Sequence, residues 1–87
     1  KFKHEAQNHF ISKIEEIKSE YDKLTEQLEW NNTIAESSYN FNPIVGKTYY
    51  LYEKNDKKFL SIIEPEKWDM KLVGEFILKT NYVWEKK

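Results

Sequence analysis

An apolar stripe runs from Phe10 to Ala35 of this chain, with spacings that alternate between four and three residues as far as Leu28. Such spacing places the side chains along one side of an α-helix. The residues between them are mostly strong helix formers, and neither glycine nor proline occurs before Pro43. The sequence therefore predicts a helix from about His4 to about Ser37. The stripe consists of Phe10, Ile14, Ile17, Tyr21, Leu24, Leu28 and Ala35.

The predicted helix has one weak point, at Asn31-Asn32-Thr33. Asparagine and threonine side chains compete for backbone hydrogen bonds, which makes them poor residues for a helix interior. A bend near Asn31-Asn32, or a break that produces a helical hairpin, is therefore an alternative to one continuous helix.

Charged residues flank the stripe. With the heptad counted from Phe10 as its first core position, the neighbouring e positions are all acidic: Glu15, Asp22, Glu29 and Glu36. An acidic row beside the core disfavours a simple two-stranded coiled coil. We therefore expect the stripe to pack on the second half of the chain or in a larger bundle.

The second half of the chain changes to a β pattern. Residues 47–53 and 58–64 are rich in strand formers and flank a turn, and Pro65 begins a single turn that ends at Trp68. Two further strands are predicted at 72–79 and 82–85. The fold class is therefore α+β, a long N-terminal helix packed on a three- to four-stranded antiparallel meander. We expect one domain, 1–87, with a helical region at 1–38 and a sheet at 44–87.

Both faces of this sheet look apolar. Tyr49 and Leu51 point to one face, whereas Tyr50 and Tyr52 point to the other. One helix covers one face only, so a folded-back helix, a second copy or another protein must cover the rest. We favour self-association, because two-sided burial in a small chain commonly indicates a shared core.

Two short motifs resemble a phosphate-binding loop and a metal-binding histidine pair, but neither has the required spacing. Gly46-Lys47-Thr48 ends like a phosphate-binding loop, but Phe41 stands where the first glycine is needed and a strand follows in place of a helix. His4 and His9 are five residues apart, too far round a helix to share a metal. We therefore predict no enzymatic activity and assign no catalytic, cofactor-binding or metal-binding residue.

The composition of the chain excludes some classes of binding partner. The net charge is −1 and no basic face is visible, which argues against nucleic-acid binding. No apolar run is long enough to cross a membrane. The chain has no cysteine, which suits a reducing compartment, and we expect a cytoplasmic protein.

The prediction for function is a non-catalytic interaction or assembly module, with itself or another protein as the partner. A small-ligand or nucleotide-binding protein with a pocket near Tyr50, Tyr52 and Trp68 is the alternative. The candidate interaction surface combines that aromatic group with the helix stripe: Tyr50, Tyr52, Trp68, Ile14, Ile17, Tyr21, Leu24 and Leu28.

The sheet half also resembles a known family. The matching residues are Gly46, Tyr49, Leu51-Tyr52, Leu60-Ser61, Pro65, Trp68, Val73-Gly74, Leu78 and Trp84. The pattern resembles a domain of unknown function that occurs in the product of human chromosome 1 open reading frame 50 and in many bacterial proteins. Tyr50 stands where that family usually has histidine, and Asn81 where it usually has aspartate. The resemblance implies no established activity, and it suggests that the Tyr, Pro and Trp positions define a fold.

Overall fold

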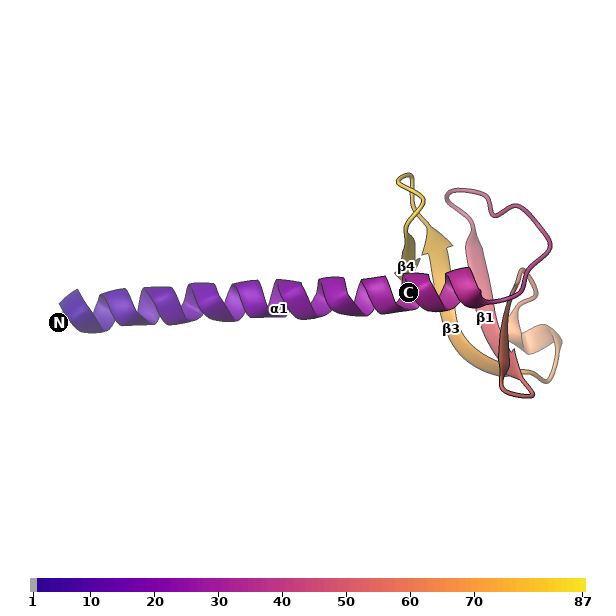
Figure 1. The fold of residues 1–87 in the computed structure, drawn as a ribbon, viewed down its shortest axis with the longest axis horizontal. Helices are drawn as coiled ribbons and strands as arrows, with labels where there is room; N and C mark the ends of the chain where they lie inside the picture. Colours follow the sequence, from indigo (N-terminus) through magenta and orange to yellow (C-terminus); the bar gives the residue numbers. More distant parts are fainter. Residues whose placement is uncertain (1) are drawn as a thin grey trace.

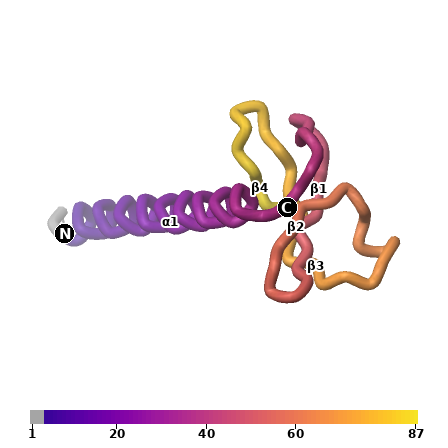
Figure 2. Tube along the Cα trace, turned by 45° about the vertical axis from the view of Figure 1, so that its right-hand side comes forward, coloured from indigo at the N-terminus to yellow at the C-terminus, as the bar shows by residue number. Residues whose placement is uncertain are grey.

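The helix α1 (Phe2–Glu36) is continuous and projects far beyond the rest of the molecule (Figure 1). The computed structural model describes residues 2–87, with side chains from residue 4, so that Lys1 of the predicted helical region lies outside the described residues. The molecule measures 61 × 27 × 23 Å. Seen from a second direction, the helix again stands clear of the sheet along most of its length (Figure 2). The predicted long helix is confirmed.

The helix passes through Asn31-Asn32 without a break. The Asn31 side chain accepts a hydrogen bond from the Trp84 backbone N–H at 2.7 Å and donates to the Trp84 carbonyl at 2.9 Å. Its amide also donates to the Gln27 carbonyl at 2.7 Å, one turn back in the helix. Asn31 is therefore tolerated inside the helix because its polar atoms bind a strand, and neither the bend nor the hairpin forms.

A four-stranded antiparallel sheet follows the helix, as predicted. Its strands are β1 (Thr48–Lys54), β2 (Lys57–Ser61), β3 (Lys71–Leu78) and β4 (Trp84–Lys86). The spatial order is β2-β1-β3-β4, so β3 pairs with β1 and the order differs from the sequential order of a meander. The connection between β2 and β3 contains the single turn predicted after Pro65, here the 3₁₀ helix η1 (Pro65–Lys67).

The main core lies between the sheet and the C-terminal end of α1. Its buried members are Ile34, Tyr49, Leu51, Leu60, Phe76, Leu78 and Trp84, and Trp30, Phe41, Val45 and Val73 pack against them. Of the two expectations for the stripe, packing on the second half of the chain is wrong, because its large apolar residues are exposed, and packing in a larger bundle stays a prediction. The sheet packs against a side of α1 centred near Ile34, about 100° around the helix from Leu24 and Leu28, and Asn31 lies at the boundary between that side and the stripe.

The opposite face of the sheet has a smaller aromatic cluster. A register shift between Leu51 and Tyr52 marks a β-bulge, and both of these neighbours are fully buried, on opposite sides. Tyr52 packs against Phe59 and against Trp68, which follows η1. The chain therefore covers part of its second sheet face with its own β2–β3 connection.

Both outer edges of the sheet are bonded to the end of α1 or to the residues that follow it. At β4, the Asn31 side chain takes the place of a neighbouring strand at Trp84. At β2, the Ser38 N–H donates to the Lys58 carbonyl at 3.1 Å, and the Ser38 carbonyl accepts from the Leu60 N–H at 3.0 Å. Free sheet edges are sites of uncontrolled strand pairing, so these bonds protect the sheet at two points.

Candidate interaction surface

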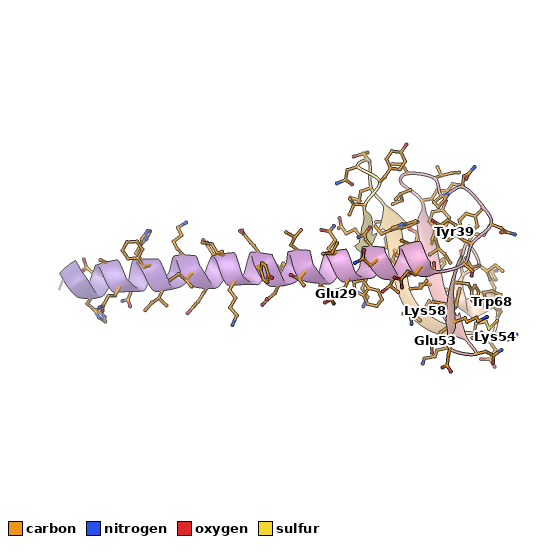
Figure 3. All side chains as sticks on the ribbon, viewed as in Figure 1. Glu29, Tyr39, Glu53, Lys54, Lys58 and Trp68 are labelled. Carbon is orange, nitrogen blue, oxygen red and sulfur yellow. The ribbon has the colours of Figure 1, made fainter. Side chains whose placement is uncertain are left out.

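The exposed helix stripe is defined here as the six large apolar residues of α1 that no other described residue covers. Each is between 59% and 67% exposed: Phe10, Ile14, Ile17, Tyr21, Leu24 and Leu28. Figure 3 shows their part of α1 projecting from the sheet with no other segment beside it. Monomeric proteins rarely expose an apolar surface this long, which makes the stripe the candidate interaction surface of the chain.

The projecting part of the helix has no tertiary support. Every residue from His4 to Leu24 is exposed. Most helical stability in proteins comes from packing of an apolar face, and a helix of ordinary composition alone in water is only partly formed. The projecting part of α1 therefore lacks the packing that stabilises most helices in proteins.

If a second helix packed on the stripe, the heptad register would determine which residues of α1 flank the contact. Core position d follows a after three residues, and the next a follows d after four. The step of four from Phe10 to Ile14 and the step of three from Ile14 to Ile17 place Phe10 and Ile17 at d and Ile14 at a. The acidic row that begins with Glu15 then occupies position b, outside the contact. The assignment of this row to position e, and the argument against a two-stranded coiled coil drawn from it, are wrong.

The stripe ends where α1 meets the sheet. The next d position after Leu24 is Asn31, whose polar atoms are bound to Trp84. Leu28 is therefore the last residue of the exposed helix stripe. On the N-terminal side, Ile11 is 53% exposed beside Phe10 and widens the stripe.

A groove of about 740 Å³ lies where α1 leaves the sheet. Leu24, Trp30 and Trp84 supply apolar lining, and Gln27 and charged residues of both signs form the remainder. The Lys86 ammonium lies 4.7 Å from the centre of the Trp30 ring, a cation–π arrangement. The groove touches the stripe only through Leu24.

In the aromatic group of Tyr50, Tyr52 and Trp68, the Tyr52 ring packs against both of the other rings. The rings of Tyr52 and Trp68 meet edge to face with their centres 5.0 Å apart, and those of Tyr50 and Tyr52 are 6.5 Å apart. The Tyr52 hydroxyl donates a hydrogen bond to the Ile63 carbonyl at 2.5 Å. Burial, and then the nearby carboxylate of Glu75, raise the pKa of Tyr50 above its usual value of 10.0. The buried Trp68 Nε1 has no hydrogen-bond partner in the part of the chain described.

The structure brings the predicted surface residues together in two separate groups. Ile14, Ile17, Tyr21, Leu24 and Leu28 lie along one side of α1, whereas Tyr50, Tyr52 and Trp68 belong to the sheet module. The two groups form no common surface (Figure 3).

Two further residues contribute to the stripe or to its attachment to the sheet, and the sequence pattern did not predict them. Ile11 lies one position beside the stripe, where the repeat does not select it. Asn31 contacts a strand 53 residues later in the sequence. Only its unfavourable place inside a helix gave a signal.

The structure shows little that would support other kinds of site. Among the residues described, no group of three or more His, Asp or Glu side chains is arranged to hold a metal ion. Within residues 2–87, no helix combines the length and the apolar character needed to cross a membrane.

Comparison with known proteins agrees with the sheet pattern and extends it to the helix. No curated protein and no solved structure matches the chain. One family model, described as a protein of unknown function (DUF2452), matches residues 3–86. The match takes in α1 from residue 3 and all four strands, so the projecting helix is part of the family unit. The chain belongs to this family of proteins of unknown function, DUF2452.

Proposed function

We propose that this chain is a non-catalytic assembly module, in which α1 binds the α1 of a second copy through the exposed helix stripe. The observation that carries the proposal is the exposure of six large apolar residues on one side of a helix that has no other support. The sheet module fixes the C-terminal end of α1 and presents the rest of the helix to a partner.

The size of the stripe suits a helix pair. Each stripe residue is about 60% exposed, which leaves on the order of 100 Å² of apolar surface per residue. Six such residues with Ile11 give about 700 Å² on one copy. Stable interfaces bury about 800 Å² per partner, so the stripe and its flanks reach the required area.

A second copy is the occupant that the stripe fits best. Between Phe10 and Leu28, every core position of the heptad holds a large apolar residue. A partner helix must offer an equally long and uninterrupted stripe, and an identical chain does so by construction. Two identical surfaces that face each other also give a closed dimer with no unpaired stripe left over.

The test uses two pairs of substitutions that add the same charge to different sides of α1. Ile17→Glu with Leu24→Glu places carboxylates in the stripe, whereas Ser12→Glu with Ser19→Glu places them on the outer side. We expect the first variant to be monomeric in light scattering and to lose helical circular dichroism, because α1 then lacks a partner. The second variant should keep both the mass and the helix content of the unchanged chain.

Tryptophan fluorescence checks that the sheet module stays folded in each variant. Ile17→Ala serves as a milder variant that keeps the helix uncharged and should weaken association without abolishing it. Unchanged association in the stripe variant, with the sheet module intact, would contradict the proposal.

One observation favours a ligand site as a second candidate function. The buried Trp68 Nε1 is a donor without a partner among the described residues, so an acceptor on a small ligand would satisfy it. A thermal-shift screen with nucleotides tests this candidate, with Trp68→Phe as the control that removes the donor. A ligand that stabilises the unchanged chain and not the Trp68→Phe chain supports it, and the absence of any shift at millimolar concentrations removes it.

A further inference from the structure

From the heptad register and the charge distribution of α1, we infer that the two helices pair antiparallel, with Ile17 of one copy opposite Tyr21 of the other. This inference rests on the proposed self-association and specifies its orientation and register. It turns the pair into a spacer that holds two sheet modules apart.

The core layers select this register. In an antiparallel pair, an a residue of one helix lies level with a d residue of the other. With Ile17 opposite Tyr21, Ile14 lies opposite Leu24 and Phe10 lies opposite Leu28. Each pairing occurs twice by symmetry, so every residue of the exposed helix stripe enters a layer and none is left over.

Registers shifted by one heptad fit the exposed helix stripe less well. In the proposed register, the midpoint of the pair falls at Ser19. A shift by one heptad in either direction leaves stripe residues without a partner.

The charges along α1 differ between its two halves. Residues 2–18 contain three lysines and three glutamates, and so carry no net charge. Residues 20–36 contain five acidic residues and one lysine, for a net charge of −4. A parallel pair would bring the two −4 halves together, whereas an antiparallel pair places each beside a neutral half. Antiparallel helix dipoles also favour this arrangement.

Specific flanking contacts differ between the two orientations. A parallel pair would place Lys13 at position g beside Lys18 at position e of the other copy, on both flanks. The antiparallel pair has two like-charge contacts at its centre, Lys18 beside Lys18 and Glu20 beside Glu20. In a parallel pair Glu20 would instead face Thr25, so removal of its charge distinguishes the orientations.

The register predicts the shape of the assembly. The sheet modules contact α1 around Asn31, which lies level with residue 7 of the other copy. At 1.5 Å per residue, the two modules are about 36 Å apart along the helix axis. Because the sheet packs about 100° from the stripe, both modules face the same side of the helix pair.

One experiment uses charge removal. Glu20→Gln should tighten the dimer about twofold, because a like-charge helix contact costs a few tenths of a kcal/mol. Glu26→Gln removes the same charge from the outer f position, and its dissociation constant should match that of the unchanged chain. Equal dissociation constants for the two variants would contradict the antiparallel register.

The decisive experiment measures distances between spin labels on the full chain, which has no cysteine of its own. Glu5→Cys places a label at an outer f position near the start of α1, and Ser19→Cys places one at the midpoint. The antiparallel register predicts about 42 Å along the axis between the two labels at residue 5. At residue 19 it predicts a short distance, about the width of the helix pair.

The outcomes separate the two levels of the proposal. Short distances at both positions would indicate a parallel pair and overturn the orientation, while leaving the assembly function in place. No dipolar coupling at either position, together with a monomeric mass, would overturn both. A long distance at residue 5 with a short one at residue 19 supports the inference.

Discussion

Asn31 is the polar contact that joins the projecting helix to the sheet, and its replacement tests how the fold holds α1. Its amide satisfies both the N–H and the C=O of Trp84 at the outer edge of β4. Asn31→Ala removes both bonds and leaves these backbone groups at a partly buried edge. A hydrogen bond contributes about 1 to 1.5 kcal/mol net, so the two together contribute about 2 to 3 kcal/mol.

The Asn31→Ala substitution also has a stabilising effect on the helix. Alanine exceeds asparagine in helix propensity by about 0.6 kcal/mol. The net loss in the free energy of unfolding should therefore be about 1.5 to 2.5 kcal/mol. The neighbouring Asn32 is exposed, and Asn32→Ala gains the same propensity without loss of a contact to β4.

Urea unfolding at one fixed protein concentration measures both variants, with circular dichroism and tryptophan fluorescence as probes. Asn31→Ala should be less stable than the unchanged chain, and Asn32→Ala slightly more stable. Asn31→Asp adds a sharper check, because its carboxylate still accepts from the Trp84 N–H but repels the Trp84 carbonyl. Equal stabilities of the Asn31→Ala and Asn32→Ala chains would refute the assigned role of Asn31.

Three further substitutions test the packing and electrostatics of the sheet module. Gly74→Ala should lower the free energy of unfolding by about 1 to 3 kcal/mol in urea unfolding, because an added Cβ would lie 2.9 Å from the Phe76 ring. Tyr52→Phe should lower it by about 1 kcal/mol in the same assay, because the Ile63 carbonyl loses its hydroxyl donor. Glu53 accepts a hydrogen bond from Lys71, which holds the pKa of the Glu53 carboxyl below 4.5. The stabilisation of the fold by this carboxylate is therefore present above pH 4.5 and is lost as the pH falls through the lowered pKa. Thermal unfolding across pH 2 to 6 should show a weaker pH dependence for Glu53→Gln than for the unchanged chain.

Local patterns predicted the elements of the fold well. The apolar spacing from Phe10 to Leu28 and the absence of glycine and proline identified α1. Segments rich in strand-forming residues, separated by turn residues, identified the four strands. These features depend on residues close together in the sequence. Strand order and the attachment of α1 depend on distant pairs such as Asn31 with Trp84, which one sequence does not reveal.

The sequence predicted which residues form the stripe of the candidate surface, but it did not predict how the sheet packs around the helix. The periodicity selected the stripe, but it did not show that the sheet would pack on another side of the helix. The sheet attaches where Trp30 and Ile34 can reach Phe76 and the core, about 100° from the stripe. The apolar period of a helix identifies a face that needs cover, and it does not say which partner provides it.

Sedimentation equilibrium of the unchanged chain over a range of concentrations tests the central claim most directly. The chain has a mass of 10.6 kDa, and association through the exposed helix stripe predicts a rise to twice that value at high concentration. A mass that stays at 10.6 kDa up to millimolar concentrations would contradict self-association. A mass that continues to rise beyond that of a dimer would contradict the closed pair of helices.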